Sequence, residues 1–177
     1  VDQFEQGLDI AIHSGILPSS SRIAKKIGEC EWLLCASPDY LEKYGTPQQP
    51  KDLMNHRCFI FSFASPWNKW AFIQDGLGVT TPVKPRGSFT QGELLRDMAK
   101  SGAGIVRLAD FHIGKDIQEG SLVLLLDEYK AEIREPIYLL YSDRKHLSPR
   151  IRVFIEFFHE KWIAHPWNVV RGLPEAT

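Results

Sequence analysis

Short apolar runs typical of β-strands alternate with helical patterns along most of the chain, and this alternation constrains the fold most strongly. The clearest helix is expected over 149–162, where five apolar residues share one helical face: Ile151, Phe154, Ile155, Phe158 and Trp162. Strands alternating with helices favour an α/β fold with a largely parallel sheet. Strands are expected at 8–13, 23–27, 32–36, 57–61, 87–89, 105–108, 122–126 and 136–141.

Local signals set several element boundaries. Ser37 before Pro38 predicts the start of a helix that ends at Gly45, since serine caps helices and proline suits their first position. Thr90 with Glu93 predicts a capping box for a helix over 91–101. Asp75-Gly76 between apolar runs predicts a hairpin. The opening residues, 1–7, resemble the last turns of a helix, so we expect a fragment of a longer protein.

The charge balance argues against a surface that grips nucleic acid or an anionic membrane. Lys and Arg number 21 and Asp and Glu 22, a net charge of −1, without the basic excess typical of such surfaces. No apolar run has the length of a membrane span, and the first residues lack a signal-peptide pattern. Three cysteines, at 30, 35 and 58, fit buried thiols in a reducing compartment. We therefore expect a cytoplasmic protein.

The sequence offers no motif for catalysis, metal binding or a nucleotide cofactor. The six histidines are far apart and form no metal-ligand spacing: they stand at 13, 56, 112, 146, 159 and 165. The segment 102–104 follows a predicted helix and precedes a strand, which is the wrong order for a phosphate-binding loop and fits a helix end. No nucleophile elbow is present. We expect no enzymatic activity, no metal and no cofactor.

Two segments are candidates for ligand binding. Phe89-Thr90-Gln91-Gly92 is the start of a predicted helix, where free N–H groups and the helix dipole attract a carboxylate or phosphate; a glycine would also let a ligand approach the backbone. His13-Ser14 follows a strand, where open α/β sheets bind ligands. The alternatives are a well-capped helix in the first case and an ordinary turn in the second.

The order of six weak motifs resembles the effector-binding domain of LysR-type transcriptional regulators. They are the strand 8–12 with Ser14-Gly15, Cys35-Ala36-Ser37-Pro38-Asp39-Tyr40-Leu41, Trp70-Ala71-Phe72, Ala99–Ile105, Gly120–Val123 and Ser148–Phe154. Together they span residues 8–162, and their order makes the match specific although each motif alone is not.

The resemblance implies a type 2 periplasmic-binding-protein-like fold of two Rossmann-like α/β lobes joined by two crossover strands. Lobe 1 would comprise 1–60 with 142–163, lobe 2 would comprise 61–141, and 164–177 would be a tail. The crossings would lie near 59–62 and 138–142. The first strand–helix–strand of lobe 1 and the N-terminal winged helix-turn-helix of this family do not occur in the chain, so lobe 1 is expected to be incomplete.

The resemblance also implies where an effector binds. It would contact His13 and Ser14 from one lobe and Phe89, Thr90, Gln91 and Gly92 from the other, with Ser37, Phe61 and Ser62 as further wall candidates. Relatives often carry Arg at the position of His13, so a permanent cationic contact is not implied here. The family pairs as homodimers or homotetramers, with the helix 91–101 near an interface, and contacts DNA only through the helix-turn-helix.

These observations predict a domain that senses a small molecule and thereby modulates DNA binding by the intact protein. The electrostatics of the helix start indicate that this molecule is a small carboxylate. The alternative is a periplasmic-type solute-binding protein with the same fold. An α/β enzyme would require a cluster of titratable groups in one cleft, and the sequence predicts none.

Overall fold

The computed structural model describes residues 8–17, 22–131, 134–141 and 149–164. These residues form two compact units. Unit 1 contains the described residues of Val1–Cys30 and Arg134–Pro166, and unit 2 contains those of Glu31–Ile133. The predicted helical start at 1–7 and almost all of the predicted tail at 164–177 lie outside the described residues.

This division differs from the predicted lobes, 1–60 with 142–163 and 61–141. The sequence predicts two strands at 23–27 and 32–36, but the structure has one strand, β2 (Ile23–Ala36), which continues from unit 1 into unit 2. The residues after it pack with unit 2, since Leu33 and Cys35 share a core with Phe59 and Phe61. Residues 31–60 therefore belong to unit 2, and 134–141 belong to unit 1.

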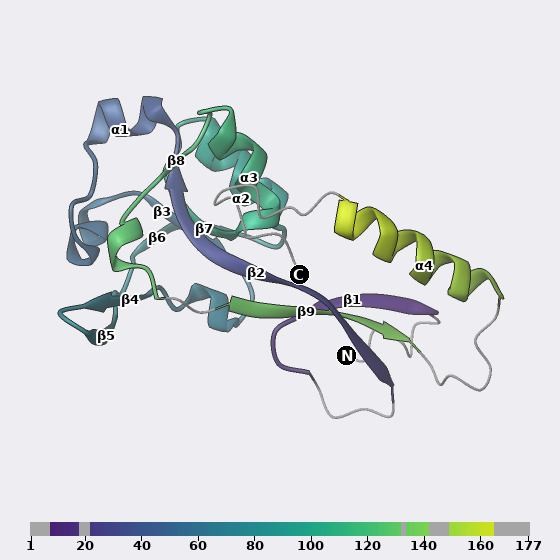
Figure 1. Ribbon diagram of the computed structural model, residues 1–177. Coiled ribbons are helices and arrows are strands. Elements are labelled where there is room, and N and C mark those ends of the chain that lie inside the picture. Colours follow the sequence, from purple (N-terminus) through teal and green to yellow (C-terminus); the bar gives the residue numbers. More distant parts are fainter. Residues whose placement is uncertain (1–7, 18–21, 132–133, 142–148, 165–177) are drawn as a thin grey trace. The chain divides into compact units, whose positions relative to one another are not determined.

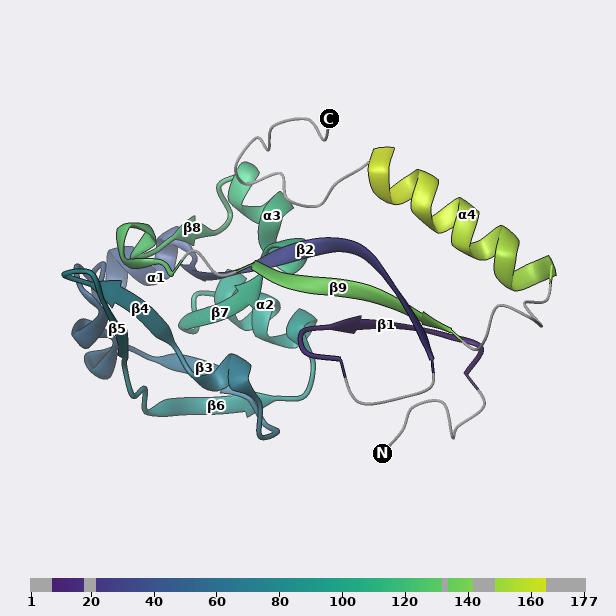
Figure 2. The ribbon, with the colours of Figure 1, turned by 60° about the horizontal axis from the view of Figure 1, so that its bottom comes forward.

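Unit 1 is built on an antiparallel strand pair. β1 (Ile10–Ser14) pairs with β9 (Arg134–Tyr141), so that Ile10 lies opposite Tyr141 and Ser14 lies opposite Ile137. Strand β9 also pairs with β2, and the two strands β1 and β9 lie side by side in both ribbon views (Figures 1 and 2). The unit also contains α4 (Pro149–Ala164), which confirms the predicted closing helix.

Unit 2 contains a mixed sheet in the order β2-β7-β3-β6. Strands β7 (Ile105–Ala109), β3 (Cys58–Phe61) and β6 (Pro85–Phe89) are parallel, whereas β2 is antiparallel to β7. The short strand β8 (Val123–Leu124) pairs with the end of β2. The α/β class is confirmed, with parallel pairing of β7, β3 and β6 in this unit and antiparallel pairing of β2 with β7.

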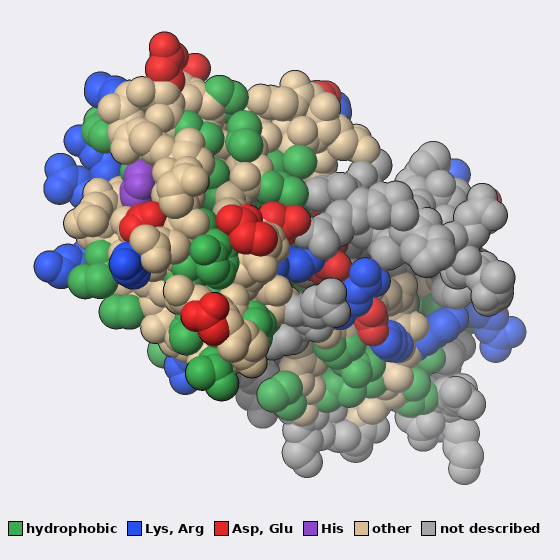
Figure 3. Space-filling view, turned by 60° about the vertical axis from the view of Figure 1, so that its left-hand side comes forward, with side chains coloured by type: hydrophobic (Ala, Val, Ile, Leu, Met, Phe, Trp, Pro, Cys, Tyr) green, Lys and Arg blue, Asp and Glu red, His purple; other side chains and the backbone are tan. Residues whose placement is uncertain are grey.

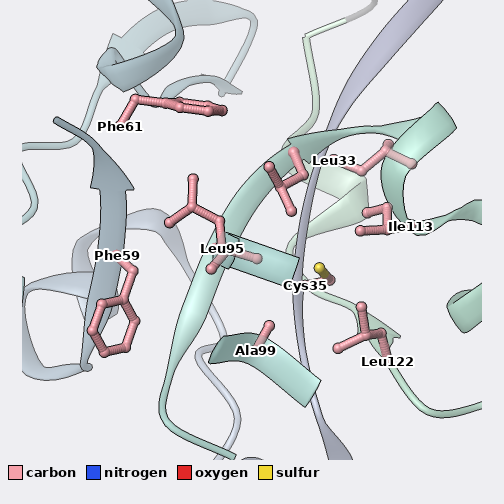
Figure 4. Close-up of a cluster of buried hydrophobic side chains, with 10 residues drawn as sticks. Leu33, Cys35, Phe59, Phe61, Leu95, Ala99, Ile113 and Leu122 are labelled. Atoms are coloured by element: carbon pink, nitrogen blue, oxygen red, sulfur yellow. The ribbon is translucent and has the colours of Figure 1, made fainter. Parts of the chain in front are cut away.

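One face of this sheet is covered by α2 (Gly92–Lys100) and α3 (Asp110–Gln118), each following a parallel strand. Leu95 and Ala99 of α2 point into the core among side chains of β2 and β3 (Figure 4). All of these core side chains are nearly inaccessible to solvent, and burying each large apolar one contributes roughly 1.5–3 kcal/mol. The helices are thereby fixed over the strand ends that precede them.

The other face packs against α1 (Pro38–Tyr44), a 3₁₀ turn at Pro50–Asn55 and a hairpin. The hairpin joins β4 (Ala71–Gln74) to β5 (Leu77–Thr80). Asp75 and Gly76 both have positive φ, of 52° and 76°, as a type I′ turn requires. Two further 3₁₀ turns lie at Pro66–Asn68 and Asp127–Tyr129.

The helix ends test the predicted caps. Ser37 caps α1, since its Oγ accepts from the N–H of Tyr40 at 3.3 Å. The predicted capping box of α2 is wrong: the N-cap is Gln91 rather than Thr90, and no side chain caps it. The helix begins one residue later than predicted, so Glu93 falls at the second position, too early to return to the cap.

The three cysteines are buried and form no disulfide, as the sequence predicts. Burial raises the pKa of the Cys58 thiol to about 12 and also raises that of Cys35, so neither is a reactive thiolate near neutral pH. In the part of the chain that the structure describes, no helix has the length and hydrophobicity needed to cross a bilayer.

Candidate functional site

The carboxyl ends of the parallel strands of unit 2 bring most of the predicted site residues together. Strand β3 ends at Phe61 and β6 ends at Phe89, and these two residues are register partners. Just beyond them, the N–H of Ser62 donates to the carbonyl of Phe89 at 2.9 Å. Thr90 and Gln91 follow directly and are exposed. These residues therefore form one edge of the unit, at the place where α/β sheets bind ligands.

The start of α2 at this edge has the features of an anion-binding helix end. Gln91 has an extended conformation, with φ −127° and ψ 143°, and no side chain caps the helix. The first N–H groups of a helix have no partner within it, so they are donors for a carboxylate or phosphate. Glu93 lies in the same turn, and its Oε1 is 3.7 Å from Nδ1 of His112.

The start of α3 at the same edge differs in the place of its carboxylate, which is at the first helical position, whereas Glu93 of α2 is at the second position and lies near His112. Asp110 is the first residue of α3 and is 3% exposed. Its Oδ1 accepts from the N–H of Phe111 at 2.9 Å. The Asp110 carboxylate already occupies an N–H at the start of α3, whereas no side chain caps α2, so of these two helix starts α2 is the better position for an anionic ligand.

Gly92 has a different role from the one that the sequence suggested. It is buried, and a Cβ at this position would lie 2.5 Å from Nε2 of His112 on α3. The imidazole therefore occupies the space where a ligand was expected to approach the backbone. Burial lowers the pKa of His112, with Arg96 lowering it further and Glu93 opposing the shift. A neutral imidazole packs α2 and α3 together at Gly92.

We predict that Gly92→Ala lowers the free energy of unfolding by about 1–2 kcal/mol, since the new methyl group forces the imidazole to move. Combined with His112→Ala, the same substitution should become neutral or stabilising by up to about 1 kcal/mol, because alanine is the better helix former. Urea unfolding of the four proteins in this double-mutant cycle measures both effects. Additive losses would show that the two residues do not clash.

Aromatic side chains that the site prediction missed surround its β3 end. Trp32, opposite Ala109 on β7, stacks on Trp67 with ring centroids 5.0 Å apart. Trp67 and Phe63 both pack on Phe61, at 5.5 and 5.2 Å. The available sequence signal was the density of aromatic residues directly after the predicted strand, from Phe61 to Trp67.

In unit 1 the structure places His13 and Ser14 as the last two residues of β1, whereas the sequence predicted that the strand ends at His13. Nε2 of His13 lies 3.0 Å from the carbonyl oxygen of Ile16. Gly15 has φ +89° and donates its N–H to the carbonyl of Pro136 at 2.9 Å. The segment is thus a strand followed by a tight turn, with both predicted side chains half-buried.

The structure separates Ser37 from the other candidates of unit 2. Its side chain is 3% exposed and caps α1. Because β2 is antiparallel to β7, Ser37 at the end of β2 lies near the amino end of β7, beside Gly102 at the end of α2. Thr90 and Gln91 lie at the opposite end of that helix. Ser37 therefore belongs to the helix cap rather than to this edge.

The described residues form neither a metal site nor, on the face drawn in Figure 3, a surface that would bind nucleic acid. Nowhere among them do three or more His, Cys, Asp or Glu side chains gather as metal ligands. On the face drawn in Figure 3, acidic, basic and hydrophobic side chains are interspersed, so that face presents no continuous basic surface of the kind that binds phosphate backbones.

Comparison with known proteins then decides the family. The model of the LysR substrate binding domain matches residues 1–163. The chain belongs to the LysR substrate-binding domain family. Its fold is accordingly of the periplasmic-binding-protein-like type 2, as the resemblance implied. The chain is 35% identical to the HTH-type transcriptional regulator CrgA of Neisseria meningitidis serogroup B over 161 residues, covering 91% of this chain and 54% of CrgA.

Other proteins similar to this LysR-family domain are named as activators. The HTH-type transcriptional activator AaeR of Escherichia coli K12 is 32% identical, over 87% of this chain and 50% of AaeR. Among solved structures, the CrgA regulatory domain superposes with a TM-score of 0.83 at 35% identity, covering 89% of this chain and 77% of that one. The full-length Vibrio cholerae virulence activator AphB superposes with a TM-score of 0.76 at 28% identity, covering 90% of this chain and 54% of AphB.

The chain spans about half the length of the curated relatives it matches. These relatives are named as a transcriptional regulator and a transcriptional activator. They favour the regulator interpretation over the alternative of a solute-binding protein, which shares the fold.

Proposed function

We propose that this domain binds a small carboxylate effector and thereby modulates DNA binding by a winged helix-turn-helix elsewhere in the intact regulator. The observation that carries the proposal is the uncapped start of α2, where Thr90 and Gln91 are exposed beside Ser62 at the carboxyl ends of β3 and β6. The first N–H groups of a helix can donate to a carboxylate without a permanent cationic side chain.

We further propose that His13 and Ser14 of unit 1 contact the same effector, with unit 2 supplying Thr90 and Gln91. A ligand held by both units favours one arrangement of the units over others, but only by the difference in its affinity for those arrangements. In a homodimer or homotetramer such a change alters how the DNA-binding domains are spaced, and so couples the effector to the choice of DNA site.

The test is a thermal-shift screen of this chain against small organic acids at neutral pH. A ligand that binds only the folded state at 100 times its Kd stabilises it by about 2.7 kcal/mol, or roughly 5–10 °C for a chain of this size. At least one carboxylate should raise the melting temperature, whereas its uncharged amide should not. If no carboxylate in the panel does so, the proposed ligand class is wrong.

Variants then assign the contacts of the carboxylate that binds. Thr90→Ala and His13→Ala should each weaken binding about tenfold, as expected for one lost hydrogen bond to a charged group. Ser37→Ala is the matched control, because Ser37 caps α1 at the other end of the sheet: it should lower stability and leave the Kd unchanged. Equal effects of all three substitutions would remove the support for these contacts.

A further inference from the structure

The chain passes between the two units at two places, and unit 2 has a charged residue close to each. The first crossing directly precedes Glu31 of β2, and the second directly precedes Arg134 of β9. Glu31 is followed by Trp32, where the described pairing of β2 with β7 begins. Lys130 is the residue after the 3₁₀ turn that precedes β9. Glu31 and Lys130 therefore lie in the two segments that connect the units.

These two residues form a largely buried ion pair, although they are 99 positions apart in the chain. Nζ of Lys130 donates to Oε2 of Glu31, and their side chains are 15% and 16% exposed. By contrast, Lys26 and Glu29 form an ion pair on the unit 1 part of β2 that is 52% and 37% exposed. Water screens an exposed pair, whereas separating a buried pair is strongly unfavourable. The Glu31–Lys130 pair therefore constrains its two segments more strongly than a surface pair does.

The segment that ends at Lys130 follows β2 back toward Glu31. Strand β8 pairs antiparallel with the end of β2, and the N–H of Leu125 donates to the carbonyl of Leu34 at 2.9 Å. Leu126 then has a φ of 52°, a left-handed conformation that is uncommon for residues other than glycine, and the 3₁₀ turn begins. After the turn, the backbone of Lys130 bridges to β4 while its side chain reaches Glu31. Backbone pairing at one end and the ion pair at the other thus hold this segment on β2.

We propose that the Glu31–Lys130 ion pair joins the two connecting segments at their unit 2 ends and thereby limits how freely the units change their arrangement. Hinge motions are absorbed by a few residues at the ends of packed elements. With the pair intact, these residues are confined to β2 before Glu31 and to the chain between Lys130 and β9. The ion pair contacts no effector, so the inference holds whatever class of ligand the domain binds.

The distance between one spin label on each unit tests the proposal in the full chain. Leu77→Cys in unit 2 and Val153→Cys in unit 1 supply the label sites, since these side chains are 69% and 63% exposed. The native thiols are buried, so the label should react with the introduced ones. Pulsed electron spin resonance then measures the width of the distance distribution. Lys130→Met removes the charge and should broaden the distribution about twofold, because the hinge is no longer confined.

Matched variants separate the ion pair from a general effect of charge. Glu31→Gln should broaden the distribution as Lys130→Met does, since either change removes the pair. Lys130→Arg keeps a cation that can bind the carboxylate, so its distribution should stay narrow. Lys26→Met is the control, because it removes a lysine from an exposed pair with Glu29 on the same strand, and it should leave the width unchanged. An unchanged width in both Lys130→Met and Glu31→Gln, or equal broadening in Lys26→Met, would refute the proposal.

Hydrogen exchange distinguishes hinge motion from unfolding of unit 2 in the same variants. The N–H of Ile105 in β7 donates to the carbonyl of Arg57 at 2.8 Å, so its exchange reports on the sheet of this unit. In Lys130→Met this amide should exchange at the wild-type rate while the distance distribution broadens. If its exchange accelerates together with the broadening, the ion pair supports the structure of unit 2 and does not act as a limit on the hinge.

Discussion

Gly104→Ala should destabilise unit 2 more than Gly92→Ala does. A Cβ at Gly104 would lie 2.2 Å from the carbonyl oxygen of Arg57 and 2.8 Å from the ring of Phe59. The first of these is backbone, fixed by the hydrogen bond from the N–H of Ile105 to the same carbonyl at 2.8 Å. The strand β7 must therefore move away from β3, at a cost of about 4 kcal/mol.

The measurement is urea unfolding followed by tryptophan fluorescence, with circular dichroism to detect protein that does not fold at all. Gly78→Ala is the matched control, because Gly78 is also in a sheet segment and a Cβ at this position would meet no described atom within 4 Å. That substitution should change the free energy of unfolding by less than about 1 kcal/mol. A loss of similar size in both variants would show that the close approach at Gly104 does not govern stability.

Asp116→Ala should be the second large loss. The Asp116 carboxylate is 1% exposed and joins α3 to α2. It accepts from Arg96 in a bidentate pair, from Nζ of Lys100 at 2.6 Å and from Oγ of Ser121 at 3.2 Å. Removing one partner of a buried pair costs about 3–5 kcal/mol; because Arg96 and Lys100 can turn toward water, we expect about 3 kcal/mol.

The same group predicts how stability depends on pH. Burial alone would raise the pKa of Asp116, but hydrogen bonds from Arg96 and Lys100 outweigh it and lower the pKa to about 2. The unfolded pKa is about 3.9, so this contribution is complete above pH ~4 and is lost as pH falls toward 2. Wild-type protein should lose more stability over that range than Asp116→Ala does, and Glu119→Ala, an exposed control, should behave as wild type.

Several elements followed from the sequence because their signals are local. The hairpin at Asp75-Gly76 needs two residues with positive φ, and the sequence supplies residues that tolerate it. The helix start at Ser37-Pro38 depends on one side chain and its own backbone. The start of α2 was misplaced by one residue: the capping-box pattern pointed to Thr90 as the N-cap, whereas the structure has Gln91 there.

The candidate site was predictable only in part. The ends of β1, β3 and β6 were found because strand ends and helix starts can be recognised along the chain. Ser37 was included as a wall candidate implied by the resemblance, and the sequence does not reveal that β2 runs antiparallel to β7, which places Ser37 at the other edge. The aromatic residues after β3 and the hydrogen bond between Asn68 and Phe61 were missed. A side chain that bonds to a strand residue seven positions away leaves no periodic pattern in the sequence.

The sequence by itself determined the family, the α/β class and the strand ends that bear the candidate site. Motif order, apolar periodicity and capping residues can each be recognised within short segments of the chain. Only the tertiary structure decided that β2 is one strand shared by two units, that Gly92 packs on His112, and that Lys130 pairs with Glu31. These features depend on residues far apart in the chain, and whether they meet is set by how whole strands and helices pack, not by the preferences of any one segment.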